Sequence, residues 1–272
     1  MKKLWMIALA CLSMVQLKAQ DDKPTKGDTT SFVLGNKKVT VVVDETAADS
    51  SDTEDIKLDL EEDKHIAHWA ALDVGVNGFM NKDGNFEMKG AYAPYELDHA
   101  KSQVWKLNFM EKKVNFIGEY VGLVTGLGVS FHGYAFKNNT ILQSTNDSTF
   151  SIMDTVINYD KNKLKATYLE LPLLLEINTS ANPKKTFHIA AGMIGGYRIG
   201  ARYKQKYELD GDKYRNKVAG HYNLMPFHLT ATTRVGYGNF TVFADYSLTP
   251  LFERGKGPEL YPFSLGVTFV GL

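Results

Sequence analysis

The C-terminal stretch Tyr261-Pro262-Phe263-Ser264-Leu265-Gly266-Val267-Thr268-Phe269 decides the fold of this chain. Every second residue is bulky and apolar, and the residues between them are small or polar. Because successive side chains of a β-strand point to opposite faces, this stretch predicts a strand with one apolar and one polar face. The same alternation recurs in seven upstream segments, at 68–79, 102–112, 119–136, 166–178, 186–205, 224–237 and 240–251. We therefore expect eight amphipathic strands.

The connections between the predicted strands alternate between long and short. Long polar loops are expected at 80–101, 137–165, 206–223 and 252–260. The shortest connection is Gly238-Asn239, a sequence typical of tight β-hairpins. Long loops at one end and short turns at the other are typical of outer-membrane barrels, which keep the short turns in the periplasm. With an even number of strands, both chain ends are then expected in the periplasm.

The two faces of the strands indicate what each face contacts. An eight-stranded parallel barrel holds roughly twelve side chains in its interior layers, and the predicted strands carry far more large apolar residues than that. The opposite faces are rich in Gly, Ser and Thr, which suits a narrow interior. We therefore predict an all-β fold, an eight-stranded antiparallel up-and-down transmembrane β-barrel over 67–272, with its apolar faces in lipid. A soluble barrel or a two-sheet sandwich is the alternative, which the length of the strands and the alternating loops disfavour.

The N-terminus has the features of a secretion signal. Met1-Lys2-Lys3 precedes an apolar stretch over 4–17 and a small-residue site at Ala19, which predicts a signal peptide over 1–19. The apolar stretch is shorter than the roughly 20 residues that a membrane-spanning helix needs. Cys11 is the only cysteine and lies inside this stretch. A lipoprotein site there is disfavoured because cleavage would leave apolar residues on the mature chain, so the mature chain is expected to contain no cysteine.

Residues 20–66 differ in composition from the predicted barrel. Ten acidic residues and a single lysine, Lys57, lie between positions 44 and 63, and aromatic residues are nearly absent. Such a segment buries too little surface to fold alone, so we expect a largely disordered N-terminal arm, acidic, mostly flexible and in the periplasm. A hairpin turning at Gly35-Asn36 and a strand that docks on a partner's sheet edge are open alternatives within it.

The polar faces carry ionisable side chains that we expect to point into the lumen. Because an unpaired buried charge is costly, they should form a structural network of ion pairs. The tight turn at 238–239 predicts Thr232 opposite Asp245, with Arg234 within reach. The next hairpin predicts Glu176 near His188. The predicted lumen network comprises Asp73, Lys106, Glu170, Glu176, His188, Arg198, Arg202, His228, Arg234 and Asp245.

Aromatic residues gather near the ends of the predicted strands. Membrane barrels place such girdles at both membrane interfaces, although strands also favour aromatic residues in general. The predicted girdle comprises Trp69, Phe79, Tyr120, Phe136, Tyr168, Phe187, Tyr203, Tyr237, Phe240 and Tyr261.

Motifs for chemistry are weak in this sequence. Ser130 and His132 share a strand face, and with Asp154 they form the best candidate set for a lipid-modifying or peptide-cleaving barrel. No nucleophile, however, lies in a recognisable setting. His65 and His68 lack the further ligands of a metal site. We therefore predict a protein that is not an enzyme, with no catalytic residues, no metal and no cofactor.

Four sequence segments and the C-terminal stretch together form a recognisable set. The segments are His68-Trp69-Ala70-Ala71-Leu72-Asp73-Val74-Gly75-Val76-Asn77, Gly122-Leu123-Val124-Thr125-Gly126-Leu127-Gly128, Tyr168-Leu169-Glu170-Leu171-Pro172-Leu173 and Tyr246-Ser247-Leu248-Thr249-Pro250-Leu251-Phe252. As a set they resemble the PorT-like outer-membrane β-barrel family of Bacteroidota. The resemblance covers 67–272 and implies an eight-stranded outer-membrane barrel without a defined activity. PorT itself is tied to protein secretion and gliding. One departure is that Val270-Gly271-Leu272 follows the last aromatic residue, whereas many barrels end on an aromatic residue.

These observations together predict an outer-membrane protein with a role in envelope structure or in surface interaction. Loop 137–165, with Asn138, Asn139, Asn146, Asp147 and Asp154, is the candidate contact surface. The alternative is an accessory or scaffold of a secretion or transport system. Expected partners are outer-membrane lipid and lipopolysaccharide, the barrel-assembly machinery during biogenesis, and a periplasmic or secretion-system partner through 20–66. Loss of the signal peptide leaves 28 basic against 31 acidic residues, which argues against nucleic acid.

Overall fold

A computed structural model describes residues 28–34, 37–43, 57–62 and 66–270 of the chain. The chain divides into two compact units, and the larger one includes Glu62–Leu272. The predicted signal peptide lies outside the described residues, and so does most of the predicted flexible arm.

Three short strands form a small sheet in the N-terminal part of the chain. They are β1 (Asp28–Leu34), β2 (Lys37–Val43) and β3 (Lys57–Glu62), in the order β1-β2-β3. The pairing of β1 with β2 agrees with the predicted hairpin, whose turn at 35–36 lies outside the described residues. Strand β3 was not predicted, because its alternation of Leu with charged residues is short and lies within the acidic run.

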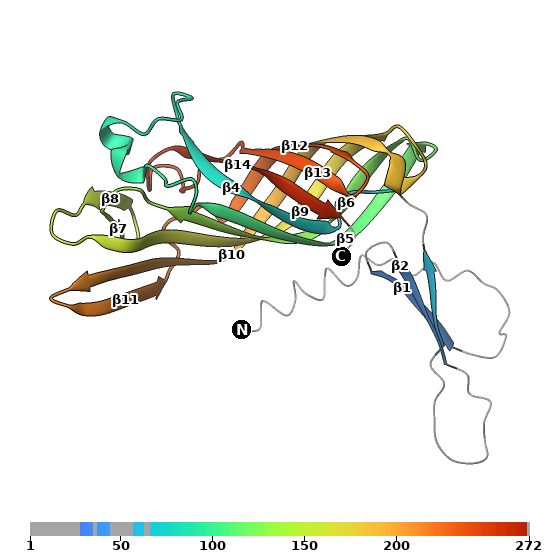
Figure 1. Cartoon of the computed structure of the whole chain (residues 1–272), viewed down its shortest axis with the longest axis horizontal. Helices are drawn as coiled ribbons and strands as arrows, with labels where there is room; N and C mark the ends of the chain where they lie inside the picture. The colour runs from blue at the N-terminus through green and yellow to red at the C-terminus, as the bar shows by residue number, and fades with distance from the viewer. Residues whose placement is uncertain (1–27, 35–36, 44–56, 63–65, 271–272) are drawn as a thin grey trace, which may run out of the picture. The chain divides into compact units, whose positions relative to one another are not determined.

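Eight longer strands pair in a closed antiparallel ring (Figure 1). Each corresponds to one predicted segment, and the ring runs β10-β12-β13-β14-β4-β5-β6-β9 and returns to β10. The closure that joins the C-terminal strand to the first predicted strand is the β14–β4 pair, from Leu260 opposite Asn81 to Val270 opposite Ala71. The strands are β4 (Ala71–Asn81), β5 (Gln103–Ile117), β6 (Val121–Ala135), β9 (Tyr159–Asn178), β10 (Phe187–Leu209), β12 (Phe227–Tyr237), β13 (Phe240–Ser247) and β14 (Leu260–Val270).

The long loops contain structure that the sequence did not predict. Strands β7 (Thr140–Ser144) and β8 (Thr149–Met153) form a hairpin inside the predicted loop 137–165. Strand β11 (Asp212–Ala219) pairs with the far end of β10, beyond the part of β10 that pairs with β12. Two 3-10 turns, η1 (Gly90–Tyr95) and η2 (Pro183–Lys185), complete the elements. Figure 1 shows β7, β8 and β11 gathered at one end of the ring.

No helix in the described part of the chain is long and apolar enough to cross a membrane.

The distribution of apolar and polar side chains in the ring is the reverse of that in a soluble protein. Leu171, Leu173 and Leu175 on β9 are about half exposed, whereas Glu170 and Glu176 on the same strand are buried. The same arrangement holds around the ring, with apolar side chains outside and polar side chains inside. An exposed apolar belt of this extent is typical of a surface that contacts lipid.

Register shifts occur at two places in the β9–β10 pair and at two in the β5–β6 pair, and one in each pair decides which residues discussed below face inward. On β10 the pairing with β9 shifts between Arg198 and Gly200. On β5 the pairing with β6 shifts between Asn108 and Met110. Because a bulge adds one residue to one strand, every side chain beyond it moves to the opposite face. The β10 shift changes the face of the predicted lumen residue Arg202, and the β5 shift turns Glu111 and Lys113 inward.

Candidate functional site: the filled lumen

The middle of the lumen holds a network of buried ion pairs. Arg234 Nη2 lies 2.7 Å from Asp73 Oδ2, and Lys106 Nζ lies 2.6 Å from Asp245 Oδ2 and 3.5 Å from Glu170 Oε2. All five side chains are at most 3% exposed. A buried charge is tolerated only when it is paired and hydrogen-bonded, so these groups hold facing walls of the ring together.

Further groups complete the coordination of Asp73 and Arg234. Asn108 Nδ2 donates to Asp73 Oδ2 at 3.1 Å, and Thr268 Oγ1 donates to Asp73 Oδ1 at 2.7 Å. The Arg234 guanidinium lies 4.8 Å from the ring centroid of Trp69 and 5.6 Å from that of Phe243, within the range of cation–π attraction. The Arg234–Asp73 pair is therefore satisfied on most sides.

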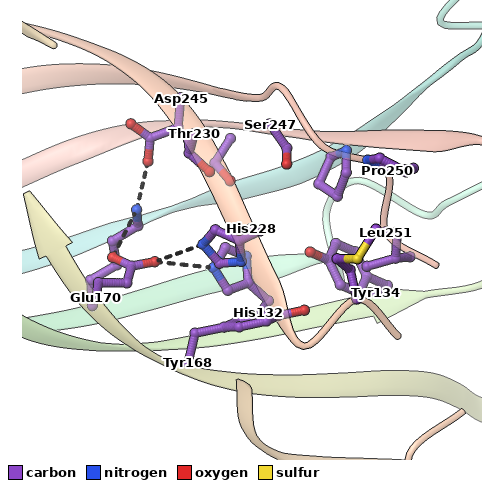
Figure 2. A pocket seen from close by; sticks show the side chains of 14 residues that line it. His132, Tyr134, Tyr168, Glu170, His228, Thr230, Asp245, Ser247, Pro250 and Leu251 are labelled. Atoms are coloured by element: carbon purple, nitrogen blue, oxygen red, sulfur yellow. Dashed lines mark hydrogen bonds and ion pairs between the residues drawn. The ribbon is translucent and has the colours of Figure 1, made fainter. Parts of the chain in front are cut away.

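A small cavity lies next to this network (Figure 2). Glu170 Oε1 stands 3.9 Å from His132 Nε2 and 4.0 Å from His228 Nε2, so one carboxylate lies between two imidazoles. Tyr168 packs edge-on against His228, with ring centroids 4.3 Å apart. The cavity measures about 30 Å³, which accommodates a water molecule or two but no organic substrate.

Residues 66–70 close the lumen at the short-turn end, and we call them the plug. The chain enters the ring there and turns back into β4 at Ala71. Lys113 Nζ donates to the carbonyl of Ile66 at 2.8 Å, and the Glu111 carboxylate accepts from the backbone N–H of Trp69 at 2.9 Å. The side chain of Trp69 is fully buried. The wall is shaped for it, because a Cβ atom on Gly126 would lie 2.7 Å from the indole.

Two histidines hold the plug to the wall. The rings of His68 and His188 stack with centroids 3.6 Å apart. His68 Nδ1 lies 3.3 Å from Glu176 Oε1, which also lies 3.3 Å from Lys113 Nζ. His188 Nε2 lies 2.7 Å from Thr241 Oγ1. The plug is thus attached to the ring by polar and charged contacts and by the packing of Trp69 in a buried apolar cluster with Val124, Leu174, Ala190 and Ile194.

An apolar cluster closes the lumen at the long-loop end, and we call it the aromatic cap. Tyr95 on η1 lies in it, and burial raises the pKa of this phenol to about 12. The Tyr203 hydroxyl donates to the carbonyl of Thr140 at 3.1 Å, which ties the β7–β8 hairpin to the wall. The cap comprises Phe79, Met88, Tyr95, Leu97, Tyr134, Phe136, Leu142, Leu164, Ala166, Tyr168, Tyr203, Tyr222, Leu224, Leu251, Phe252 and Leu260.

Most of the sequence-predicted network residues face the lumen, with one clear exception. Arg202 is exposed on the outer wall, so its assignment to the lumen is wrong. The β10 bulge is the reason, because it turns Arg202 outward and Tyr203 inward. Arg198, before the bulge, is half-buried, and its guanidinium donates to the carbonyl of His221.

The predicted partners inside the lumen differ from the observed ones. Thr232 does lie opposite Asp245, as the turn predicts. Arg234, however, pairs with Asp73 across the ring, and Asp245 pairs with Lys106. These contacts join strands that are not sequence neighbours, so hairpin register alone does not predict them.

The sequence did not reveal the residues that bind the plug. Glu111 and Lys113 lie beyond the β5 bulge, so strict alternation continued from Lys106 and Asn108 does not place them on the inward face. His68 and Trp69 were assigned to the first strand, which in fact begins at Ala71. The predicted strand start at 68 is therefore wrong, and both side chains lie inside the lumen.

Four of the ten residues of the predicted aromatic girdle are exposed, and five are buried inside the ring. Tyr120, Phe187, Tyr237 and Phe240 are exposed near the short turns, where a membrane girdle is expected. Trp69 belongs to the plug, and four others belong to the cap, so their assignment to the girdle is wrong: Phe79, Phe136, Tyr168 and Tyr203. Tyr261 is half-buried on β14.

The candidate catalytic residues do not assemble into a site. Ser130 is fully buried in the wall. The Asp154 carboxylate accepts hydrogen bonds from the backbone N–H of Val156 and the hydroxyl of Tyr159, and these hold its pKa below the usual range. Asp154 therefore organises the loop, where its hydrogen bonds come from Val156, Ile157 and Tyr159. No group of three or more potential metal ligands occurs in the described ranges.

The chain belongs to the family described as outer membrane protein β-barrel domain, whose model matches residues 106–253. Two crystal structures of Ail, the attachment invasion locus protein of Yersinia pestis, resemble it, and one of them is in complex with the heparin analogue sucrose octasulfate. They are 11% and 12% identical, with TM-scores of 0.29 and 0.30, over 73% of this chain and 95% and 94% of Ail. At this similarity they carry no argument about function. No curated protein sequence matches the chain.

Proposed function

We propose that this outer-membrane barrel is a non-conducting, non-enzymatic protein that acts through its loops at the cell surface. The observation that carries the proposal is the filled lumen: plug, ion-pair network and aromatic cap follow one another along its length. The cavity beside the network measures only about 30 Å³. A conducting pore needs a continuous polar path, and the cap interrupts it.

Conductance in planar bilayers tests this proposal. The purified wild-type chain should give no steady current after its insertion is verified by heat-modifiable gel mobility. A stable single-channel conductance from the folded wild type would contradict the filled lumen as the basis of the function.

We further propose that the short turns and both chain ends lie in the periplasm, and that the long loops are outside. The alternation of loop length supports this orientation. Because the mature chain is expected to contain no cysteine, single cysteines at Asn146 and Asn239 report opposite ends. A membrane-impermeant maleimide should label N146C in intact cells and N239C only after lysis; the reverse pattern would overturn the orientation.

The contact surface that we propose is the tip formed by the β7–β8 hairpin and the residues after it. Phe150, Ile152, Met153 and Val156 are exposed there, and Val156 is 82% exposed. Asn138 and Asn139, by contrast, hold the loop together through Ala93 and Asn158. Exposed apolar residues next to polar ones are typical of protein contact sites.

Photo-cross-linking in intact cells tests the tip. A photoreactive residue at Phe150 should give discrete protein adducts, whereas one at Tyr237, which is also aromatic and exposed but lies near the short turns, should not give the same adducts. Identical adducts from both positions, or none from position 150, would rule out the tip as the contact surface.

A PorT-like accessory role in secretion is the second candidate, and the N-terminal sheet favours it. Strands β1, β2 and β3 form a sheet separate from the ring, which offers a docking element for a periplasmic partner. Deletion of 20–56 removes β1 and β2 and leaves the plug in place. Under this candidate the deletion abolishes a periplasmic cross-link and impairs secretion, while the conductance and the heat-modifiable mobility stay unchanged.

A further inference from the structure

A large group of cationic side chains lies on the outer wall, where β9, β10 and β11 form one sheet at the long-loop end. Residues that pair directly in a sheet point to the same side, so the register places them on one face. That side is the outside, because the alternate residues Asn162, Leu164 and Tyr203 are buried inside. We call this set the basic face: Lys161, Lys163, Lys165, Arg202, Lys204, Lys206, Lys213, Arg215 and Lys217.

The cations of the basic face stand directly opposite one another across the three strands. Lys204 pairs in register with Lys163 on one side and with Lys217 on the other. Lys206 pairs in the same way with Lys161 and Arg215. Like charges directly opposite in a sheet destabilise it, so this arrangement is unfavourable unless an anion compensates it.

Few carboxylates of the protein itself neutralise the basic face. In the described ranges, the ion pair of Lys206 with Asp160 at 3.1 Å is the only one that involves a member of the set. Glu208 shares the face, opposite Lys213. The β10 bulge contributes to the excess, because it turns Arg202 and the lysines after it outward. The face therefore has an excess of positive charge that is open to an external partner.

The position of the basic face indicates the source of the anion. The outward residues of β9 from Ile177 to Leu169 are apolar, and after Thr167 they continue as Lys165, Lys163 and Lys161. From Ile177 to Lys165 the strand rises about 40 Å at roughly 3.3 Å per residue, which at a tilt of roughly 40° is about 30 Å along the membrane normal. The apolar band of an outer-membrane barrel is roughly 25 Å tall, so Lys165 lies just beyond it, where the polar headgroup region begins.

A groove beside the face provides space for a headgroup. It measures about 390 Å³ and is lined by Lys161 and Lys163, by Lys101 and Lys137 from neighbouring loops, and by the carboxylates of Asp98 and Asp160, of which Asp160 pairs with Lys206. Lys101 and Lys137 pair with Asp98 and Glu96 at 2.9 and 2.7 Å. The two lysines of the basic face are thus the available cations of the groove.

We propose that the basic face binds the phosphate groups of the glycolipid in the outer leaflet of the outer membrane. Lysine ammonium groups bind phosphate as point charges, and arginine adds two parallel hydrogen bonds. The assignment of the phosphates to the outer leaflet rests on the proposed orientation of the loops. The binding of phosphate to the basic face does not depend on that orientation. It is also independent of any partner of the β7–β8 tip. The bound phosphates offset the repulsion between the facing cations.

Native mass spectrometry of the detergent-solubilised full chain tests the proposal. The probes are bis-phosphorylated lipid A, the same lipid after enzymatic dephosphorylation, and a phosphorylated core oligosaccharide without acyl chains. The wild type should bind the phosphorylated lipid best, and less well at high ionic strength. Each cation beside anionic headgroups contributes a factor of roughly five, so the central-row variant K163Q/K204Q/K217Q should bind it about 100-fold more weakly.

The matched control is K112Q/K184Q/K185Q, which removes the same charge near the short turns. It should bind lipid A as the wild type does, and both triple variants should show heat-modifiable mobility. Equal binding of the dephosphorylated lipid, or equal weakening by the control, would overturn the proposal. Binding of the soluble oligosaccharide as tight as that of lipid A would overturn the leaflet as the source and assign the face to a soluble polyanion.

Discussion

The two ends of the lumen are closed in different ways. At the short-turn end the plug is a segment that belongs to no ring strand, and it is held by charged groups such as Glu111 and Lys113 and by the packing of Trp69. At the long-loop end the aromatic cap consists of side chains from the ring strands and loops themselves. The polar contacts of the plug can be replaced by water when the segment leaves the wall, whereas the cap, which is apolar throughout, resists exposure to water. The difference indicates that any opening of this barrel starts at the plug.

Loss of Arg234 should have the largest effect on stability. Arg234→Met leaves Asp73 buried without its cation, which should lower the free energy of unfolding by about 3–5 kcal/mol. Urea titration in detergent, followed by heat-modifiable mobility, measures this loss. The double variant D73N/R234M is the control and should recover much of it; a double variant as unstable as the single one would show that the charge pairing is not the cause.

Truncation of a plug side chain should have the next largest effect on stability. It should also distinguish the short-turn end of the lumen from the long-loop end. Trp69→Ala removes a fully buried side chain and its contact with Arg234, which should cost about 3 kcal/mol. It should also make the segment before Ala71 sensitive to protease, as followed by N-terminal sequencing of the fragments. Unchanged protection in a folded W69A barrel would contradict the idea that this end opens first.

Truncation within the aromatic cap should destabilise without opening the short-turn end. Leu164→Ala creates a cavity among apolar side chains, which should cost about 2 kcal/mol because loops around it can close in. The same urea titration measures the loss, and the protease pattern should match that of the wild type. Equal proteolysis of the plug in L164A and W69A would show that the two closures are coupled.

Substitution at the exposed tip should have the smallest effect on the fold. Val156→Ser changes a side chain that is 82% exposed, so the free energy of unfolding should change by less than about 0.5 kcal/mol. Cross-links from position 150 should nevertheless decrease under the proposed function. A marked loss of stability would instead assign Val156 to the packing of the loop.

The sequence predicted the ring but only part of what fills it. Period-2 alternation is local, so all eight strands and the closure of β14 on β4 were predictable from it. Arg202 was placed on the wrong face, and Glu111 and Lys113 were not identified, because a bulge depends on cross-strand pairing that alternation does not contain. The assignment of Trp69 and of the inward aromatic residues to the girdle was wrong for a related reason. An apolar residue near a strand end can face lipid or pack inside the lumen, and the sequence does not distinguish the two.

The sequence by itself determined the number of strands in the ring, the apolar outer belt and the polar interior. Each follows from the alternation of apolar and polar residues along the chain. The tertiary structure alone decided which charges pair, as Arg234 with Asp73 and Lys106 with Asp245, because these contacts cross the lumen between distant strands. It also decided that residues 66–70 fill the interior and that the β10 bulge turns a row of cations outward. A closed ring brings distant walls within reach of one another, and no local pattern specifies which residues then meet.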